Sequence, residues 1–278
     1  MKEKKNHTEG EVVRILEASP RRVAPKCPVY GECGGCALQH ASYDLQLEIK
    51  TSQVRELLRR FAKLPEAPVN QILPSPAQWA YRNRISIHLD RQRVGFFHRK
   101  SRELVNVEHC PLASEEVNTA AAELLAATVI EMCGTGELLV DAYCGSGFFA
   151  KRLLEKFQKI TGLEWSQGAV AEAKRSATDK ETYLPGAVEN SLARVLSEAP
   201  LAGTTLLVDP PAEGLSPDVA RAILENPPAR LVYVSCDPAT FSRDAAKFLE
   251  SYTLSRVQPV DMFPQTAEIE VAALFLLA

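Results

Sequence analysis

The sequence of 278 residues predicts an α/β fold with a parallel, doubly wound sheet, preceded by a smaller N-terminal module. From residue 113 onward, short apolar runs alternate with helical patterns, as in a sheet covered by helices on both faces. One run, LLVDAYCGSG, ends in a glycine-rich turn, which is typical of strands that approach a ligand. Upstream, cysteines cluster in a Pro- and Gly-rich stretch. We therefore expect a lead-in at 1–25, a cysteine-bearing module at 26–112 and the α/β domain at 113–278.

The N-terminal module contains one clear helical pattern and one hairpin pattern. A helix is expected from Tyr43 to Ala62, ended by a Pro-rich connector from Pro65 to Pro76. Its apolar side chains at approximately helical spacing are Leu45, Ile49, Val54, Leu57, Leu58 and Phe61. Farther along, RISIHLD and RVGFFHR flank a short polar turn and predict a β-hairpin.

Seven strands are expected in the α/β domain. They are LLVDA, ITGLE, a weaker one near 183–189, TTLLV, RLVYVSC, and two final strands near 252–260 and 268–277. The helices that separate them are expected at about 114–131, 148–158, 166–177, 216–225 and 239–250. The alternation of the two element types predicts the fold class.

Charge is distributed unevenly along the chain. Lysine and arginine outnumber the acidic residues by 19 to 12 in residues 1–110, whereas the acids outnumber the bases by 23 to 13 in the remainder. A basic segment joined to an acidic one indicates a module that faces nucleic acid. No apolar run approaches the ~20 residues of a membrane helix, and the charged start MKEKKNHTEGE is unlike a signal peptide. We expect a cytoplasmic protein with no membrane partner.

Two features at strand ends indicate a nucleoside-containing cofactor. Gly145 and Gly147 form a loop that lacks the Lys-Ser/Thr pair of a phosphate-binding loop. Glu164 ends the next strand, where a carboxylate can accept hydrogen bonds from both hydroxyls of a ribose. S-adenosyl-L-methionine contains a ribose and no phosphate, and therefore fits both features.

The next two strands end in residues suited to chemistry on a planar base. In VDPP, two prolines fix an extended turn that presents Asp209 to a pocket. Amino-group methyltransferases use a similar turn followed by an aromatic residue, where this chain has Ala212. Cys236, in YVSCDPATFSRD, precedes a helix expected to begin near Ala239. The N–H groups and dipole of that helix would favour a thiolate.

A strand-end cysteine suits methylation of uracil at C5. Thiolate addition to C6 makes C5 nucleophilic, and a base must later remove the C5 proton. Two carboxylates in DMFPQTAEIE, Glu268 and Glu270, are candidates for that base. Residues spaced i, i+2 on a strand share a face, so the pattern does not choose between them.

Four further cysteines form a spaced set: Cys27, Cys33, Cys36 and Cys110. Four thiolates fit a structural zinc ion or an iron–sulfur cluster. Zinc ligands usually come as two close doublets, whereas these are three plus one. The Gly34-Gly35 pair lets backbone N–H groups approach sulfide, which favours the cluster.

Together these motifs resemble the RNA uracil-5-methyltransferase family, in particular its iron–sulfur branch that modifies 23S ribosomal RNA. The motifs are CPVYGECGGCALQH, WAYRNRISIHL, DAYCGSG, VDPP, YVSCDPATFSRD and DMFPQTAEIE. The resemblance implies a Rossmann-like class I methyltransferase domain. It implies that Cys236 is the nucleophile and Glu270 the base. Its implied cofactor contacts are Tyr143, Glu164 and Asp209, beside the loop residue Gly145. Its implied [4Fe-4S] ligands are Cys27, Cys33, Cys36 and Cys110.

The chain also departs from the family pattern. Too few residues precede Cys27 for a TRAM-type RNA-binding domain, and the central segment carrying a Phe-Gln-x-Asn stretch is missing. Phe148 and Ala212 stand where the family has Asn and Arg. Ala267-Glu268 follows FPQT where the family tends to have a His pair or Ser-His.

The resemblance implies an RNA partner, 23S ribosomal RNA first and tRNA as the alternative, and we expect a monomer. Candidate RNA contacts are Arg82, Arg84, Arg99, Lys100 and Arg102, with Tyr81, Phe96 and Phe97. Two other functions remain open. A cytosine-5-methyltransferase would carry a second cysteine beside the proline pair, and none is present here. A non-catalytic iron–sulfur RNA-binding protein would not need Cys236 and Glu270.

Overall fold

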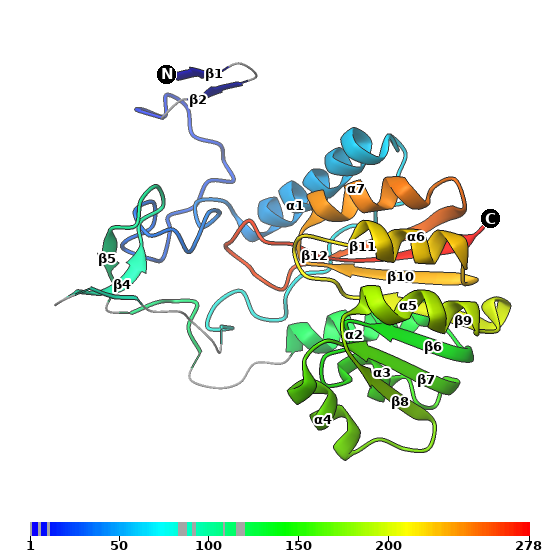
Figure 1. Ribbon diagram of the computed structural model, residues 1–278. Helices are drawn as coiled ribbons and strands as arrows, with labels where there is room; N and C mark the ends of the chain where they lie inside the picture. Colours follow the sequence, from blue (N-terminus) through cyan, green and yellow to red (C-terminus); the bar gives the residue numbers. More distant parts are fainter. Residues whose placement is uncertain are drawn as a thin grey trace.

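The computed structural model describes residues 2–4, 7–9, 12–82, 88–90, 93–107, 109–114 and 120–278. Within these ranges, a sheet of seven strands forms the centre of the C-terminal domain, in the order β11-β12-β10-β9-β6-β7-β8 (Figure 1). In chain order the strands are β6 Gly136–Ala142, β7 Phe157–Glu164, β8 Glu181–Pro185, β9 Thr204–Val208, β10 Arg230–Ser235, β11 Tyr252–Val260 and β12 Glu270–Leu277. The expected α/β class and the seven strands are confirmed.

The sheet is mixed, because β12 runs antiparallel to both of its neighbours, β10 and β11. The expectation of an all-parallel sheet is therefore wrong for this strand. A parallel neighbour needs a crossover of a dozen or more residues, and the loop 261–269 between β11 and β12 is too short for one. As a result, the first residue of β12 lies beside the last residues of β10.

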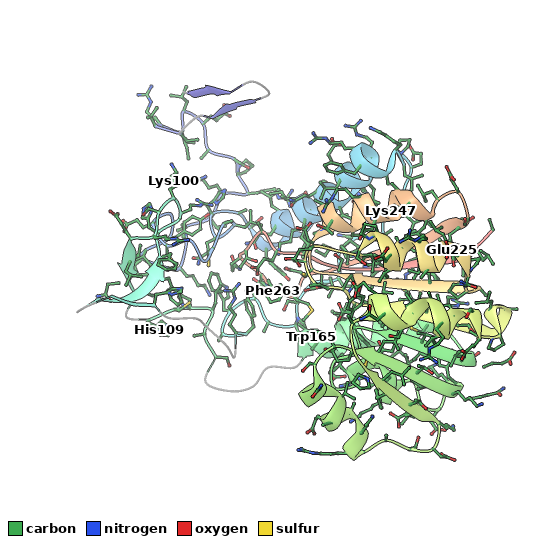
Figure 2. The ribbon with its side chains drawn as sticks, in the orientation of Figure 1. Lys100, His109, Trp165, Glu225, Lys247 and Phe263 are labelled. Atoms are coloured by element: carbon green, nitrogen blue, oxygen red, sulfur yellow. The ribbon has the colours of Figure 1, made fainter. Side chains whose placement is uncertain are left out.

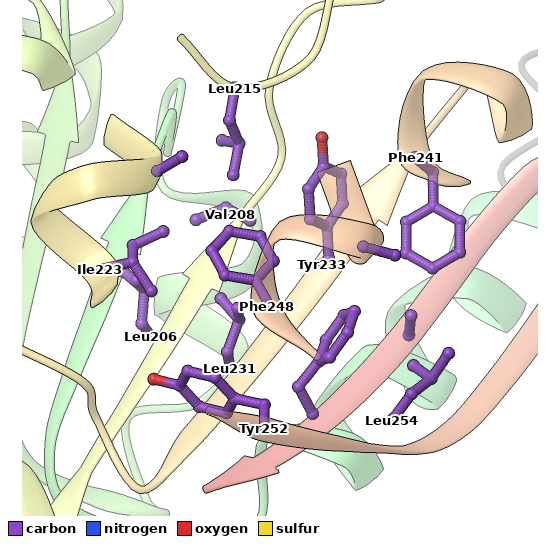
Figure 3. Close-up of a cluster of buried hydrophobic side chains, with 14 of the residues drawn as sticks. Leu206, Val208, Leu215, Ile223, Leu231, Tyr233, Phe241, Phe248, Tyr252 and Leu254 are labelled. Carbon is purple, nitrogen blue, oxygen red and sulfur yellow. The ribbon is translucent and has the colours of Figure 1, made fainter. Parts of the chain in front are cut away.

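Each face of the sheet is covered by helices, and the two faces bury separate cores. On β9, Leu206 and Val208 face one core and Leu207 the other, because successive side chains of a strand point to opposite faces. The first core includes Tyr233, Phe241, Phe248, Tyr252 and Phe275, several of them in edge-to-face contact. Figure 3 shows part of this cluster between the sheet and its helices.

The helices of the α/β domain are α2 Ala120–Cys133, α3 Phe148–Arg152, α4 Gln167–Arg175, α5 Val188–Ser197, α6 Pro217–Glu225 and α7 Pro238–Phe248, with a short 3-10 turn η2 at Leu201–Gly203. Helix α3 ends at Arg152, earlier than expected, because residues 153–156 form a turn that leads into β7. Helix α5 was not expected. Its buried residues Val188, Leu192 and Leu196 recur at intervals of four, a helical signal present in the sequence.

The expected N-terminal helix is present as α1, Tyr43–Leu57, extended by a wider π-helical turn, η1, at Leu58–Ala62. Its expected apolar face is wrong in part. Ile49 and Phe61 are 40% and 42% exposed, whereas Gln46 and Lys50 are buried. The helix therefore turns a partly polar stripe inward.

Residues 43–73 pack as part of the α/β domain. Val54 and Leu58 belong to the first core, and η1 and α1 lie against α7. The segment after the helix forms parallel bridges to β11, from Val69 to Val257 and from Leu73 to Val260. Residues 43–73, which precede the expected domain boundary at 112/113, thus share the hydrophobic core of the α/β domain.

The remaining N-terminal residues form a smaller unit beside the carboxyl edge of the sheet (Figure 1). Strands β3 His88–Asp90, β4 Arg93–Phe97 and β5 Leu104–Asn106 form an antiparallel sheet, which confirms the expected hairpin in β3 and β4. A short hairpin, β1 Lys2–Lys4 with β2 His7–Glu9, precedes this unit. Among the described helices, none combines the length and apolar character needed to span a membrane.

The orientation of α1 and η1 generates a stability prediction. Leu58→Ala should lower the free energy of unfolding by about 2–5 kcal/mol, because it leaves a cavity in the core. Phe61→Ala, at an exposed position three residues later, should change it by less than about 0.5 kcal/mol. Denaturant titration of both variants measures this difference. Equal losses would contradict the inward face of the helix.

Candidate active site

The candidate site lies where four parallel strands, β6, β7, β9 and β10, reach their carboxyl ends. Because these strands run in one direction, their ends gather at one edge of the sheet. The structure places Tyr143, Gly145, Glu164, Asp209 and Cys236 there, each directly after or at the end of its strand. This edge faces the smaller N-terminal unit (Figure 1).

The loop after β6 has an unusual backbone. Tyr143, Gly145 and Gly147 all adopt positive φ, at 66°, 54° and 85°. A Cβ at Gly147 would lie 2.7 Å from the Tyr183 hydroxyl oxygen, so only glycine fits this position. The loop is held from the neighbouring strand, because one Glu164 carboxylate oxygen accepts a hydrogen bond from the Gly145 N–H at 3.1 Å.

Glu164 is 7% exposed, and its other carboxylate oxygen accepts a hydrogen bond from the Ser166 N–H at 2.8 Å. Each carboxylate oxygen has a second lone pair, so both can still accept from a ligand hydroxyl. Next to it, Trp165 is 74% exposed at the end of β7, at the edge nearest the N-terminal unit (Figure 2). Sequence analysis did not identify Trp165. Its signal was a large aromatic residue directly after the acidic strand end.

Asp141, the penultimate residue of β6, is fully buried. Its Oδ2 accepts a hydrogen bond from the Ala150 N–H, whereas Oδ1 is buried without a partner among the described residues. Burial and the nearby Asp209 raise the pKa of Asp141 to about 8. A buried oxygen without a partner at a glycine-rich loop is an uncommon feature that a ligand would satisfy.

Cys236 and Glu270 meet at the same level of the sheet on adjacent strands. Ser235 of β10 pairs with Val271 of β12, and Cys236 and Glu270 are the next residues of the two strands toward the edge. Cys236 is exposed, and Glu270 is partly buried. The site therefore combines an accessible thiol with a carboxyl group in a restricted environment.

Burial and, for Glu270 and Cys236, neighbouring negative charges raise the pKa values of the groups at this edge. Burial, followed by Asp209 and Glu268, raises the pKa of Glu270 to about 7. Asp209 as a whole residue is exposed, but burial of its carboxyl group among the strand ends raises its pKa to about 6. Burial and the Glu270 carboxylate also raise the pKa of the Cys236 thiol. Without a substrate, the thiol form of Cys236 is thus favoured.

The expectation that the following helix favours a thiolate is not met. Asp237 is the N-cap of α7, and its Oδ1 accepts hydrogen bonds from the Ala239 and Thr240 N–H groups at 2.8 and 2.9 Å. The donors that would stabilise a thiolate are therefore occupied by a carboxylate. A capping Asp directly after the cysteine explains the difference.

The structure separates the two candidate carboxylates of DMFPQTAEIE. Glu268 precedes β12, so the expected shared strand face does not apply to it. Its side chain is 60% exposed, and its Oε2 lies 3.2 Å from Nη2 of Arg82. Glu270 is less exposed and acts electrostatically on Cys236. Geometry distinguishes these residues where the sequence pattern did not.

Cys27, Cys33, Cys36 and Cys110 line one cavity of about 270 Å³ in the N-terminal unit. The hairpin packs against the first cysteine-bearing segment, where the Gly34 N–H donates to the Phe97 carbonyl. Burial raises the pKa of Cys27, and the nearby thiols of Cys33 and Cys110 also raise it. Among the residues that the structure describes, however, no three Cys, His, Asp or Glu side chains are arranged to hold one metal ion.

The candidate RNA contacts divide into two groups. Arg99, Lys100 and Arg102 lie at an exposed turn, and Phe97 is 38% exposed and stacks on His88. Tyr81 is buried and donates its hydroxyl to the Pro264 carbonyl, so its ring is not available to a base, and Phe96 is half-buried and lines the cysteine cavity. Arg82 pairs with Glu268, and Arg84 lies outside the described residues.

Comparisons with known proteins converge on one class. A family model described as tRNA (Uracil-5-)-methyltransferase matches residues 194–277, a range that contains Asp209, Cys236 and Glu270. A Bdellovibrio bacteriovorus protein described as an uncharacterized RNA methyltransferase is 30% identical over 332 residues, covering 97% of this chain and 84% of that protein. An RNA methyltransferase of Aquifex aeolicus with the same description is 28% identical over 380 residues, covering 99% and 89%.

The alignment of 380 residues is longer than this chain of 278, so the relative carries internal segments that this chain lacks. Among solved structures, the Pyrococcus abyssi tRNA (uracil-54, C5)-methyltransferase, in complex with S-adenosyl-L-homocysteine, superimposes with a TM-score of 0.72. It is 21% identical and the match covers 95% of this chain and 88% of that one. This likeness shows a shared fold.

The environment of Cys236 generates a prediction about thiol reactivity. Alkylation of Cys236 by iodoacetamide should have a pH midpoint above the ~8.5 of a free cysteine, because burial and Glu270 disfavour the thiolate. Glu270→Gln removes a negative neighbour, lowers the pKa of the thiol and should speed alkylation at pH 8. Mass spectrometry of the labelled Cys236 peptide measures the rate. A slower reaction in Glu270→Gln would contradict this electrostatic coupling.

Proposed function

We propose that this chain, which belongs to the S-adenosylmethionine-dependent RNA (uracil-5-)-methyltransferase family, methylates uridine through a covalent bond between Cys236 and uracil C6. The observation that carries this proposal is the position of Cys236 beside Glu270 at the carboxyl edge of the sheet. A thiol nucleophile and a carboxylate base are the two groups that C5 methylation of uracil requires.

The reaction proceeds in three steps. The Cys236 thiol loses its proton to solvent and adds to C6 as a thiolate, and the electron pair of the C5–C6 double bond moves onto C5 and its neighbouring carbonyl. C5 then takes the methyl group from the sulfonium of S-adenosylmethionine, which leaves S-adenosylhomocysteine. Glu270 removes the C5 proton, the double bond re-forms and the Cys236 thiolate departs.

Glu270 suits its role because its pKa is close to neutrality. With a pKa of about 7, the carboxylate is partly ionised at neutral pH and is basic enough to accept the C5 proton. Glu268 is less suited, because it is exposed and paired with Arg82. We therefore assign the base to Glu270.

Tyr143, Gly145, Glu164 and Asp209 hold S-adenosylmethionine in this proposal. The residues present fit this group: Glu164 retains acceptor capacity for ribose hydroxyls, and Oδ1 of Asp141 is a buried oxygen without a partner among the described residues. The exposed ring of Trp165 offers a flat apolar surface for the adenine. The glycine loop carries no basic residue, as expected for a ligand without phosphate.

A [4Fe-4S] cluster bound by Cys27, Cys33, Cys36 and Cys110 is part of the proposal. Four thiols around one cavity form a suitable donor set. The three-plus-one spacing of the cysteines and the Gly34-Gly35 pair favour the cluster over a zinc ion. Its role is structural, because methyl transfer moves no free electron.

The RNA target is a uridine of 23S ribosomal RNA in this proposal, with tRNA as the alternative. Residues 26–112 serve as the recognition module, and the exposed turn with Arg99, Lys100 and Arg102 contacts the phosphate backbone. The protein acts as a cytoplasmic monomer. Mapping 5-methyluridine in both RNA classes, from cells with and without the gene, separates the two targets.

The nucleophile has a direct test. Cys236→Ala should abolish methyl transfer to RNA and leave S-adenosylhomocysteine binding unchanged, because the thiol acts on the base. Transfer of tritium from labelled S-adenosylmethionine and isothermal calorimetry measure the two properties. Methylation by Cys236→Ala would rule out the covalent mechanism.

Loss of the proposed base, Glu270, should stop the reaction at a later step than loss of Cys236. Glu270→Gln should stall after methyl transfer and accumulate a covalent protein–RNA complex on ordinary uracil, seen as a slow band on a denaturing gel. Glu268→Gln is the matched control and should release product. The reverse pattern would transfer the role of the base to Glu268.

Metal analysis of the purified protein tests the proposed iron–sulfur cluster. Protein purified without oxygen should be brown and contain about four iron atoms per chain. Cys36→Ser should lose most of the iron. Stoichiometric zinc in place of iron would contradict the cluster.

A further inference from the structure

Lys50 presents an ammonium group in the interior of the protein. Its side chain is fully buried on α1, and Nζ lies 2.6 Å from Oδ1 of Asp261, whose side chain is also fully buried. Nζ also donates to the Phe263 carbonyl at 3.0 Å. The second oxygen of Asp261 accepts a hydrogen bond from the Tyr43 hydroxyl at 2.9 Å. Both partners of this ion pair are thus held by hydrogen bonds.

A fully buried ion pair carries a large desolvation penalty, which lowers the stability of the fold. Removing the two charges from water costs several kcal/mol per ion, and apolar residues of similar volume are often as stable or more stable. None of the proposed chemical steps uses Lys50 or Asp261. The pair does, however, hold two parts of the chain in a fixed geometry, since Nζ of Lys50 contacts both Asp261 and the Phe263 carbonyl.

The ion pair lies at the start of the loop that leads to β12, the strand that begins with Glu270. Asp261 directly follows Val260, and Val260 is the residue of β11 that pairs with Glu270 of β12. Lys50 also holds the carbonyl of Phe263, two residues farther along the loop 261–269. This loop connects β11 to β12 and ends at Glu270. Fixing its first residues therefore fixes the strand pairing that sets the position of Glu270.

A second contact from the same helix face supports this reading. Gln46 lies one turn before Lys50, and its side-chain amide exchanges hydrogen bonds with Gln265, accepting from the backbone N–H at 3.0 Å and donating to Oε1 at 2.9 Å. Gln265 is buried with a φ of 70°, which a non-glycine residue adopts only when its surroundings enforce it. The Gln265 carbonyl accepts from the N–H groups of Ala37 and Leu38.

We propose that Lys50 is a positioning residue, which holds Asp261 and the loop 261–269 so that Glu270 lies within reach of the C5 proton of the methylated uracil. The inference rests on the proposed role of Glu270 as the base. Loss of Lys50 displaces Glu270 and slows elimination of Cys236 more than it slows methyl transfer. A displacement of about 1 Å can reduce the rate of such a step by about 10²-fold.

The test compares three variants with the wild-type holoenzyme in single-turnover reactions on uridine-containing RNA. Lys50→Met removes the ammonium group, and Lys50→Met/Asp261→Asn also removes the charge that would otherwise remain buried and unpaired. Lys174→Met, at an exposed position on α4, is the control. Quenched samples give the methylated RNA still bound to protein and the methylated RNA released, and S-adenosylhomocysteine binding gives the folded fraction.

The expected result is that both Lys50 variants methylate the RNA and release it about 10²-fold more slowly, so that the covalent complex accumulates. If Lys50 only stabilised the fold, its loss would lower the amounts of protein-bound and of released methylated RNA in proportion to the folded fraction. The ratio of bound to released RNA would then be unchanged. If Lys50→Met does not fold, the double variant decides the matter. A wild-type ratio of bound to released product in the folded variant overturns the proposal.

Glu270→Gln in the same assay separates this inference from the function on which it rests. If Glu270→Gln accumulates the complex and the Lys50 variants do not, Lys50 has no positioning role. If Glu270→Gln releases product normally, the assignment of the base fails, and the assignment of Lys50 fails with it.

Discussion

The site depends on the direction of one strand, β12, which lies between β10 and β11 and runs antiparallel to both. Strand β10 delivers Cys236 to the carboxyl edge of the sheet, as a parallel strand must. Strand β12 runs the other way, so its first residue, Glu270, begins at that same edge. A parallel β12 would have placed Glu270 at the opposite edge of the sheet. The direction of β12 brings the proposed nucleophile and the proposed base together.

Electrostatics at this edge suit a cationic methyl donor. Burial raises the pKa values of Asp141, Asp209 and Glu270 to about 8, 6 and 7, and neighbouring carboxylates contribute to the shifts of Asp141 and Glu270. A sulfonium placed among these groups favours their ionised forms, because an opposite charge lowers the pKa of a carboxyl group. In the proposed mechanism, Glu270 would therefore be held in its ionised form, the form that accepts a proton, when a sulfonium is bound at this edge. The exposed Glu268, paired with Arg82, is less affected by such a change.

Sequence analysis predicted features that depend on local pattern. Strand-end positions identified Glu164, Asp209 and Cys236, because parallel strands end together. It did not predict the features that depend on tertiary contacts. Apolar periodicity cannot reveal that Lys50 is buried, since its burial requires Asp261, which lies 211 residues away. The direction of β12 was predictable from its short connection. Asp237, a typical N-cap residue directly before the helix, was also visible in the sequence.

The covalent bond between Cys236 and uracil tests the central claim most directly. RNA that carries 5-fluorouridine at the target position should form a permanent adduct, because fluorine cannot leave C5 as a proton does. Protease digestion followed by mass spectrometry then locates the modified residue. The account predicts an adduct on the peptide that contains Cys236, absent from Cys236→Ser. An adduct on another cysteine, or methylated 5-fluorouridine released without an adduct, would contradict it.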